Sequence, residues 1–195
     1  MLDGSSNSII ASTRKPMPRR RFLQLLAGSS AIAAGLPDVS LAATKRNVIP
    51  RELAFHNTHT GEQVSLTYFE KGEYLTDALQ EIDNVFRDHR TGDVHPIDPN
   101  LLNILYKLQE TLQVNKPFHI ISGYRSPWSN GELHASSNGV AKNSLHMQGK
   151  AVDIRIEGVD ILDIRNTAIA LQQGGVGYYP SSDFVHIDTG LARYW

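Results

Sequence analysis

Two short segments in the C-terminal part of the chain alternate apolar and polar residues, and this alternation constrains the fold more than any other feature. Residues 151–156 (Ala-Val-Asp-Ile-Arg-Ile) and 184–188 (Phe-Val-His-Ile-Asp) both place valine and isoleucine two positions apart. Side chains alternate between the two faces of a strand, so Asp153, His186 and Asp188 lie opposite the apolar residues. The chain is therefore expected to form a sheet with one face on a core and one accessible, polar face.

The other elements predict how that sheet is built. Alternation over residues 51–56 and 63–69, around a turn-forming stretch, predicts a β-hairpin. Apolar residues three and four apart predict a helix capped by Thr76 and a second helix from Asp98 to about Leu112. Further expected elements are strands at residues 118–121 and 176–179, a long polar loop at residues 128–145 and a helix at residues 159–173. Helices followed by mostly hairpin-connected strands predict an α+β domain with helices flanking a small antiparallel sheet.

The polar face of the two strands suggests a metal site. His146 precedes Asp153 by seven residues, and Gly149 between them allows a tight turn back towards the strand. If the two strands are neighbours, His146, Asp153 and His186 converge. Two imidazoles and one carboxylate suit Zn²⁺, and three protein ligands leave a fourth position open for chemistry. On the residues alone, the alternative that each is an isolated polar side chain stays open.

Composition narrows the function. The 195-residue chain has no cysteine, which excludes disulfides, thiolate zinc sites and a cysteine nucleophile. Its 19 Lys and Arg against 20 Asp and Glu give a formal net charge of −1, so nucleic acid is not an expected partner.

The first 42 residues have the organisation of an export signal. Arginines 19–21 precede Phe22 and Leu23, a moderately apolar stretch follows, and small residues end it near Ala42. Paired arginines in this position are typical of the twin-arginine type of signal. Glycine, serine and proline interrupt the apolar stretch, so a membrane anchor is the weaker interpretation and the mature protein is expected to have no integral membrane segment. Residues 43–195 are then one exported domain, located in the periplasm.

The segment from Ser144 to Asp153 reads Ser-x-His-x-x-Gly-x-Ala-x-Asp and resembles the signature of zinc peptidoglycan peptidases. That fold family includes D-Ala-D-Ala carboxypeptidases and dipeptidases, L-Ala-D-Glu endopeptidases and the Hedgehog zinc domain. The resemblance is closest to murein endopeptidases of the MepK type. It covers residues 59–62, 87–90, 122–126, 144–153, 174–180 and 184–188. It implies that residues 43–195 form a zinc peptidase domain whose His146, Asp153 and His186 hold one zinc ion.

The resemblance also implies roles for Asp183 and Arg125, and the positions of Asp188 and Ser144 in the sequence suggest roles for those two residues. Related peptidases carry an acid three residues before the last histidine ligand, which makes Asp183 the favoured general base; Asp188, on the same strand face as His186, is the alternative. Arg125 is implied as a partner for a developing oxyanion or a substrate carboxylate. Ser144 either hydrogen-bonds the substrate or shapes its own loop.

The function implied is hydrolysis of the peptide cross-links of peptidoglycan. A D,D-carboxypeptidase that trims stem peptides and a non-catalytic cell-wall-binding protein are the alternatives, and the oligomeric state stays undetermined. The chain retains all three ligands and both candidate acids, which favours an enzyme. Of the aromatic residues, Trp128, Tyr178 and Tyr179 are expected to line a cleft, whereas Trp195 is expected to pack. His59 and His89 are expected to be structural.

Overall fold

The structure is a computed structural model, and it describes residues 49–137 and 139–195. The export signal predicted for residues 1–42 lies outside the described residues. Within the described ranges, none of the helices combines the length and the apolar character needed to cross a bilayer.

One eight-stranded sheet organises the domain, in the order β3-β2-β1-β4-β5-β7-β6-β8. The strands are β1 Arg51–Asn57, β2 Gln63–Glu70, β3 Glu73–Tyr74, β4 Phe118–Ser122, β5 Ala151–Ile156, β6 Gly175–Tyr179, β7 Phe184–Asp188 and β8 Arg193–Tyr194. The β1–β4 and β6–β8 pairs are parallel, and the other neighbours are antiparallel. The predicted mixture of helices and sheet is confirmed, but the expectation of a small antiparallel sheet is wrong, because the sheet is larger and mixed.

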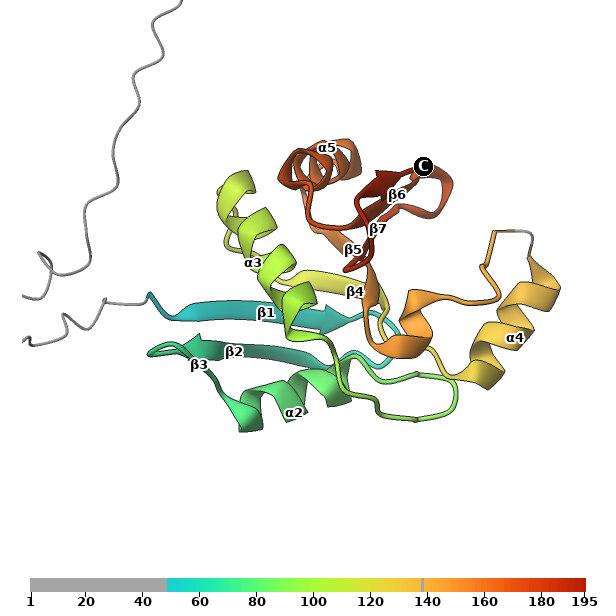
Figure 1. Ribbon diagram of the computed structural model, residues 1–195, viewed down its shortest axis with the longest axis horizontal. Coiled ribbons are helices and arrows are strands. Elements are labelled where there is room, and N and C mark those ends of the chain that lie inside the picture. The colour runs from blue at the N-terminus through green and yellow to red at the C-terminus, as the bar shows by residue number, and fades with distance from the viewer. Residues whose placement is uncertain (1–48, 138) are drawn as a thin grey trace, which may run out of the picture. The chain divides into compact units, whose positions relative to one another are not determined.

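Three helices cover the apolar face of this sheet: α2 Thr76–Val85, α3 Pro99–Leu112 and α5 Ile161–Leu171. Their buried side chains join those of β1, β4, β5 and β7 in a single hydrophobic cluster. The Phe55 ring of β1, for example, meets the Phe86 ring edge-on with 4.9 Å between centroids. In Figure 1, α3 and α5 lie side by side. With the helices on the apolar face, the polar face of β5 and β7 is left for the site.

The helix starts follow local chemistry. The Asp98 side chain accepts a hydrogen bond from the Asn100 amide and caps α3, as predicted. At α2 the prediction is off by one residue, because Leu75 occupies the cap position without a side-chain hydrogen bond and Thr76 is the first helical residue.

A fourth helix, α4 Pro127–Ser136, lies where a long polar loop was expected, and this prediction is wrong. Ser126 caps the helix because its side chain accepts a hydrogen bond from the Ser129 amide. Pro127 occupies the first turn, where a backbone N–H has no partner within the helix, so the missing N–H of proline costs nothing. The buried residues of α4 are polar, Ser129 and Asn130, so no apolar period marks the helix in the sequence. In Figure 1, α4 stands apart from the other helices.

Candidate metal centre

The centre is formed by side chains on the polar face of β5 and β7. These strands are antiparallel neighbours whose register pairs Asp153 with His186, which meets the condition on which the predicted convergence depended. His146 comes from the 3-10 helix η1 Leu145–Gln148. The side chains of His146, Asp153 and His186 are all at least largely buried. One ligand atom of each residue lies within 4.8 Å of the others, so the three can hold a metal ion together.

The separations of the facing atoms match those of a small tetrahedral ion site. His186 Nδ1 is 2.9 Å from Asp153 Oδ1, and His146 Nε2 is 3.2 Å from His186 Nδ1 and 3.3 Å from Asp153 Oδ1. Zinc bonds of about 2.0–2.2 Å at tetrahedral angles place neighbouring ligand atoms roughly 3.3 Å apart. The donor set therefore fits zinc in both composition and spacing.

The second ring nitrogen of each histidine is bound from outside the cluster. His146 Nδ1 is 2.7 Å from the Gly123 carbonyl oxygen, and His186 Nε2 is 3.0 Å from Asp188 Oδ2. Both outer partners are acceptors, so these nitrogens carry the hydrogen and the opposite nitrogens direct their lone pairs at Asp153. Two lone pairs and a carboxylate oxygen at such separations repel one another unless a positive charge lies among them.

The pKa values of His186 and Asp153 also show that this site favours positive charge. Burial alone would lower the pKa of His186, but its hydrogen bonds to Asp153 and Asp188 outweigh burial and raise that pKa to about 9. Burial would likewise raise the pKa of Asp153, yet the charges and hydrogen bonds of the two imidazoles hold it far below its ordinary value. The environment favours a cation between Asp153 and the imidazoles, whether a proton or a metal ion.

Gly149 brings His146 to the end of β5. It follows η1 in the left-handed conformation, with φ at 64°, and a Cβ there would collide with the Pro96 carbonyl oxygen. Only glycine accepts both the conformation and the close approach. The tight turn predicted between His146 and Asp153 is therefore confirmed.

Asp188 is wholly engaged in hydrogen bonds. Its carboxylate has no exposed side-chain surface, and it accepts from His186 Nε2, from the Gly175 and Gly190 amides and from Arg193. Burial would raise the pKa of Asp188, but the His186 and Arg193 hydrogen bonds lower it well below its usual range. The strand face predicted for Asp188 is confirmed, and on it the carboxylate contacts the outer nitrogen of His186.

Asp183 lies at the start of β7 and is exposed. Its side chain is 62% exposed, and Oδ2 is 2.9 Å from Nη1 of Arg155, which lies two residues beyond Asp153 on the same strand face. Its chain neighbours Ser182 and Phe184 both line the cleft over the centre. In the structure described here, the Asp183 carboxylate is turned to Arg155 and not to the three clustered side chains.

Arg125 lies beside the centre, in the loop before α4. It is buried, and Nη2 is 3.5 Å from Asp153 Oδ2 and 3.2 Å from Ser122 Oγ. Nη1 is 3.4 Å from Asn130 Oδ1, and Nε has no hydrogen-bond partner among the described residues. These contacts are long for a guanidinium, so donor capacity remains for a group that enters the cleft.

Ser144 caps the turn that carries His146. Its Oγ accepts from the His146 amide at 3.3 Å, and the residue is buried at the cleft wall. Of the two roles considered for Ser144, this contact is the loop-shaping one; its hydroxyl hydrogen is still free to be donated.

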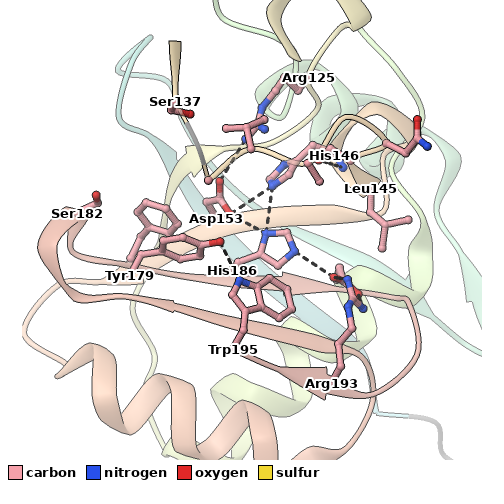
Figure 2. A pocket seen from close by; sticks show the side chains of 17 residues that line it. Arg125, Ser137, Leu145, His146, Asp153, Tyr179, Ser182, His186, Arg193 and Trp195 are labelled. Atoms are coloured by element: carbon pink, nitrogen blue, oxygen red, sulfur yellow. Dashed lines mark hydrogen bonds and ion pairs between the residues drawn. The ribbon is translucent and has the colours of Figure 1, made fainter. Parts of the chain in front are cut away.

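The centre lies in a cleft of about 580 Å³. Figure 2 shows Arg125, His146, Asp153 and His186 converging in it, with Tyr179, Trp195 and Arg193 on the opposite side from Arg125. Of the three aromatic residues expected to line a cleft, Tyr179 lines this one, whereas Tyr178 packs against the hydrophobic core and Trp128 is exposed on α4 outside the cleft lining. Trp195, expected to pack, lines the cleft, and Arg193 was not predicted at all.

Comparison with known proteins finds relatives that match the domain containing this cleft. A protein-family model described as "Peptidoglycan L,D-endopeptidase MepK" matches residues 45–195. The chain is 45% identical over 177 residues to the peptidoglycan L,D-endopeptidase MepK of Escherichia coli strain K12, which covers 91% of this chain and 96% of that protein. It is 40% identical over 178 residues to a probable peptidoglycan L,D-endopeptidase MepK of Haemophilus influenzae, covering 91% and 95% respectively.

Proposed function

The chain belongs to the peptidoglycan L,D-endopeptidase MepK family, and on that premise we propose that it is a zinc metallopeptidase that hydrolyses peptide cross-links of peptidoglycan. The observation that carries the proposal is the convergence of His146, Asp153 and His186, each histidine with an outer hydrogen-bond acceptor, at the floor of a cleft. The names of the relatives indicate an L,D-endopeptidase. The favoured bond is the link between two diamino acids, by analogy with MepK-type murein endopeptidases.

We assign the metal to these three residues. A zinc ion bound there would supply Lewis-acid polarisation of the scissile carbonyl and an acidified water as nucleophile. Asp188 holds His186 in the orientation that presents Nδ1, because its buried carboxylate accepts from Nε2. Asp188 is thus a positioning residue, since its hydrogen bonds leave it no capacity to exchange protons.

Asp183 is the proposed general base. Its side chain is exposed, and its chain neighbours Ser182 and Phe184 line the cleft. The role requires the carboxylate to leave Arg155 and turn towards the centre. There it takes the proton of the attacking water and passes it to the leaving amine. Arg125 donates to the scissile carbonyl oxygen as negative charge develops on it, and Ser144 holds the turn of His146.

The charges of the cleft favour an endopeptidase over the D,D-carboxypeptidase. A carboxypeptidase must bind the terminal carboxylate of its substrate, usually through an exposed cation. Of the arginines that line the cleft in the described residues, Arg125 is buried beside Asp153, and Arg193 is 2.7 Å from Asp188 Oδ2. Arg193 is bound to Asp188, and Arg125 is assigned to the scissile carbonyl oxygen, so neither guanidinium is left for a terminal carboxylate. This suits a substrate that continues past the scissile bond.

The same proposal includes export. The first 42 residues have the sequence organisation of a twin-arginine signal, and peptidoglycan is reached from the periplasm. Residues 43–195 are then the mature peptidase domain.

Digestion of defined cross-linked muropeptide dimers tests the proposal. Purified mature protein with Zn²⁺ is expected to convert L,D-linked dimers to monomers, and chelation is expected to abolish the conversion. Mass spectrometry of the products identifies the bond. Release of a terminal D-residue without loss of dimer would favour the carboxypeptidase, and binding to sacculi without any change of muropeptides would favour the non-catalytic protein.

A further inference from the structure

Strand β6 presents almost no side chains to the centre. Gly175, Gly177 and Tyr179 alternate on the polar face of the sheet, and Gly177 pairs directly with His186 on β7. A Cβ at Gly177 would lie 2.8 Å from the Trp195 indole, a contact too close for real side chains. The glycine therefore provides the space in which the Trp195 ring lies, 5.4 Å between centroids from the His186 imidazole.

The segment that carries Trp195 is held by backbone pairing. β8 pairs in parallel with β6, the Trp195 amide donates to the Val176 carbonyl, and the Tyr178 amide donates to the Trp195 carbonyl. The Arg193 guanidinium of the same segment binds Asp188. Trp195 is thus fixed beside the centre by the same strands that fix His186.

Because the Trp195 indole uses the Tyr179 oxygen as an acceptor, the Tyr179 hydroxyl still has its own hydrogen to donate. Trp195 Nε1 donates to the Tyr179 oxygen at 2.9 Å, and an indole nitrogen is a donor only. The phenol must therefore direct its own hydrogen to another acceptor, and within residues 49–137 and 139–195 no protein acceptor for it is found. The Tyr179 ring stacks on Phe184 at 4.6 Å between centroids, which fixes its direction.

The hydroxyl is directed into the cleft. Tyr179 and Trp195 both line it, and Figure 2 shows the Tyr179 ring extending towards Asp153 and His186, with its oxygen bound by Trp195. Tyr179 lies across the three clustered side chains from Arg125. A hydroxyl with an unassigned hydrogen, oriented by a fixed indole beside a metal centre, is the arrangement of a preorganised hydrogen-bond donor.

We propose that the Tyr179 hydroxyl donates a hydrogen bond to the scissile carbonyl oxygen as it becomes an oxyanion, and that Trp195 is the residue that positions this hydroxyl. The inference rests on the proposed function and adds a catalytic residue to it. The proton stays on Tyr179 throughout, so the step breaks no bond in the protein. Arg125 and Tyr179 then approach the same oxygen from two sides.

Tyr179→Phe tests this, because it removes only the hydroxyl. Loss of one such donor lowers kcat by about 10²-fold; we expect that loss on L,D-linked dimers with KM and zinc content unchanged. Trp195→Phe keeps an aromatic ring but no N–H, and a smaller loss of kcat is expected. Tyr178→Phe is the matched control: Tyr178 lies on the opposite face of β6, near Arg165, and wild-type kinetics are expected.

A second measurement separates donation from mere packing. A phosphinate analogue of the cross-link carries tetrahedral anionic oxygens, so Tyr179→Phe should weaken its inhibition by the same factor as kcat/KM, whereas the product peptide should bind unchanged. A kcat within twofold of wild type, an unchanged inhibition constant for the phosphinate, or activity lost in step with zinc would overturn the inference. Wild-type protein that cuts no cross-linked dimer would overturn the proposed function itself, which is a distinct result.

Discussion

Two pairs of neighbouring histidines show what makes a metal centre in this fold. The rings of His59 and His89 are the closer pair, with 3.8 Å between centroids and 10° between planes. The rings of His146 and His186 are 5.0 Å apart and tilted by 59°. Stacked rings point their nitrogens outwards in parallel planes, whereas tilted rings can direct one nitrogen each at the same point. Proximity of two imidazole rings is therefore a poor guide to a metal site.

The hydrogen-bond partners of the two pairs explain the orientation. His59 Nε2 is bound to the Ile121 carbonyl, and within residues 49–137 and 139–195 no carboxylate is hydrogen-bonded to either stacked ring. In the centre, Gly123 and Asp188 bind the outer nitrogens, and Asp153 faces both inner ones. The pKa of His89 is lowered by burial and by the charges of His59 and Arg90, while that of His186 is raised. Extra positive charge is disfavoured at His89 and favoured at His186.

Removing one histidine from each pair should have very different effects on zinc binding and activity, and this is the largest contrast that we expect. His146→Ala removes one of three ligands, so zinc binding and cleavage of cross-linked dimers should both fall below detection. His89→Ala removes one stacked ring and should leave zinc content at one per chain and activity within about threefold of wild type. Zinc analysis and muropeptide digestion of both variants check this. Loss of zinc from His89→Ala, or its retention by His146→Ala, would contradict the assignment.

The second-largest contrast is expected between the two acids near His186, Asp188 and Asp183. Asp188→Asn disturbs the partner that orients His186, and loss of such an outer partner typically weakens metal affinity about 10–100-fold. Asp183→Asn leaves the ligands intact, so zinc affinity should be unchanged while kcat falls by about 10²-fold or more, as for loss of a general base. Competition with a chromophoric chelator and steady-state kinetics separate the effects. Equal zinc affinity of Asp188→Asn and wild type would remove the positioning role.

The smallest expected effect concerns the carboxylate beside the stacked pair. Burial would raise the pKa of Asp88, but the nearby Ser129 hydroxyl and the hydrogen bonds from the Ser126 and Arg90 backbone amides outweigh burial and lower that pKa to about 2. Because the folded pKa is below the unfolded one, this stabilisation is present above about pH 4 and is lost as the pH falls towards 2, in total about 2 kcal/mol. Asp88→Asn should flatten that part of the pH dependence.

Denaturant unfolding at pH 5 and pH 3 measures the effect. Wild type should lose more unfolding free energy than Asp88→Asn over this interval, because only the wild-type carboxylate takes up a proton on unfolding. Identical slopes for the two proteins would show that the buried Asp88 carboxylate does not contribute in this way.

Strand parity predicted the centre because it is a property of local sequence. The alternation in β5 and β7 fixes which face carries Asp153 and His186. That the two strands are neighbours, with Asp153 opposite His186, was a condition of the prediction and is shown only by the structure. Parity could not separate the roles of Asp183 and Asp188, because it assigns a face and says nothing of which ring nitrogen a carboxylate meets. That distinction needs the side-chain hydrogen bonds.

Other features depend on contacts that a local pattern does not contain. The parallel β1–β4 pair joins strands separated by the whole segment that includes α2 and α3, so the mixed sheet could not be read from alternation. Helix α4 buries polar Ser129 and Asn130 and shows no apolar period. A signal for Trp195 did exist: two glycines alternate on the site face of β6, which marks a strand against which another group packs closely.

Anomalous diffraction at the zinc edge, from crystals of the mature protein grown with Zn²⁺, tests the metal centre most directly. The expected result is one strong peak bonded to His146 Nε2, His186 Nδ1 and an Asp153 carboxylate oxygen, with Gly123 and Asp188 still on the outer nitrogens. A peak bonded through the other nitrogen of either histidine, a peak between His59 and His89, or no ordered zinc at the three side chains would contradict it.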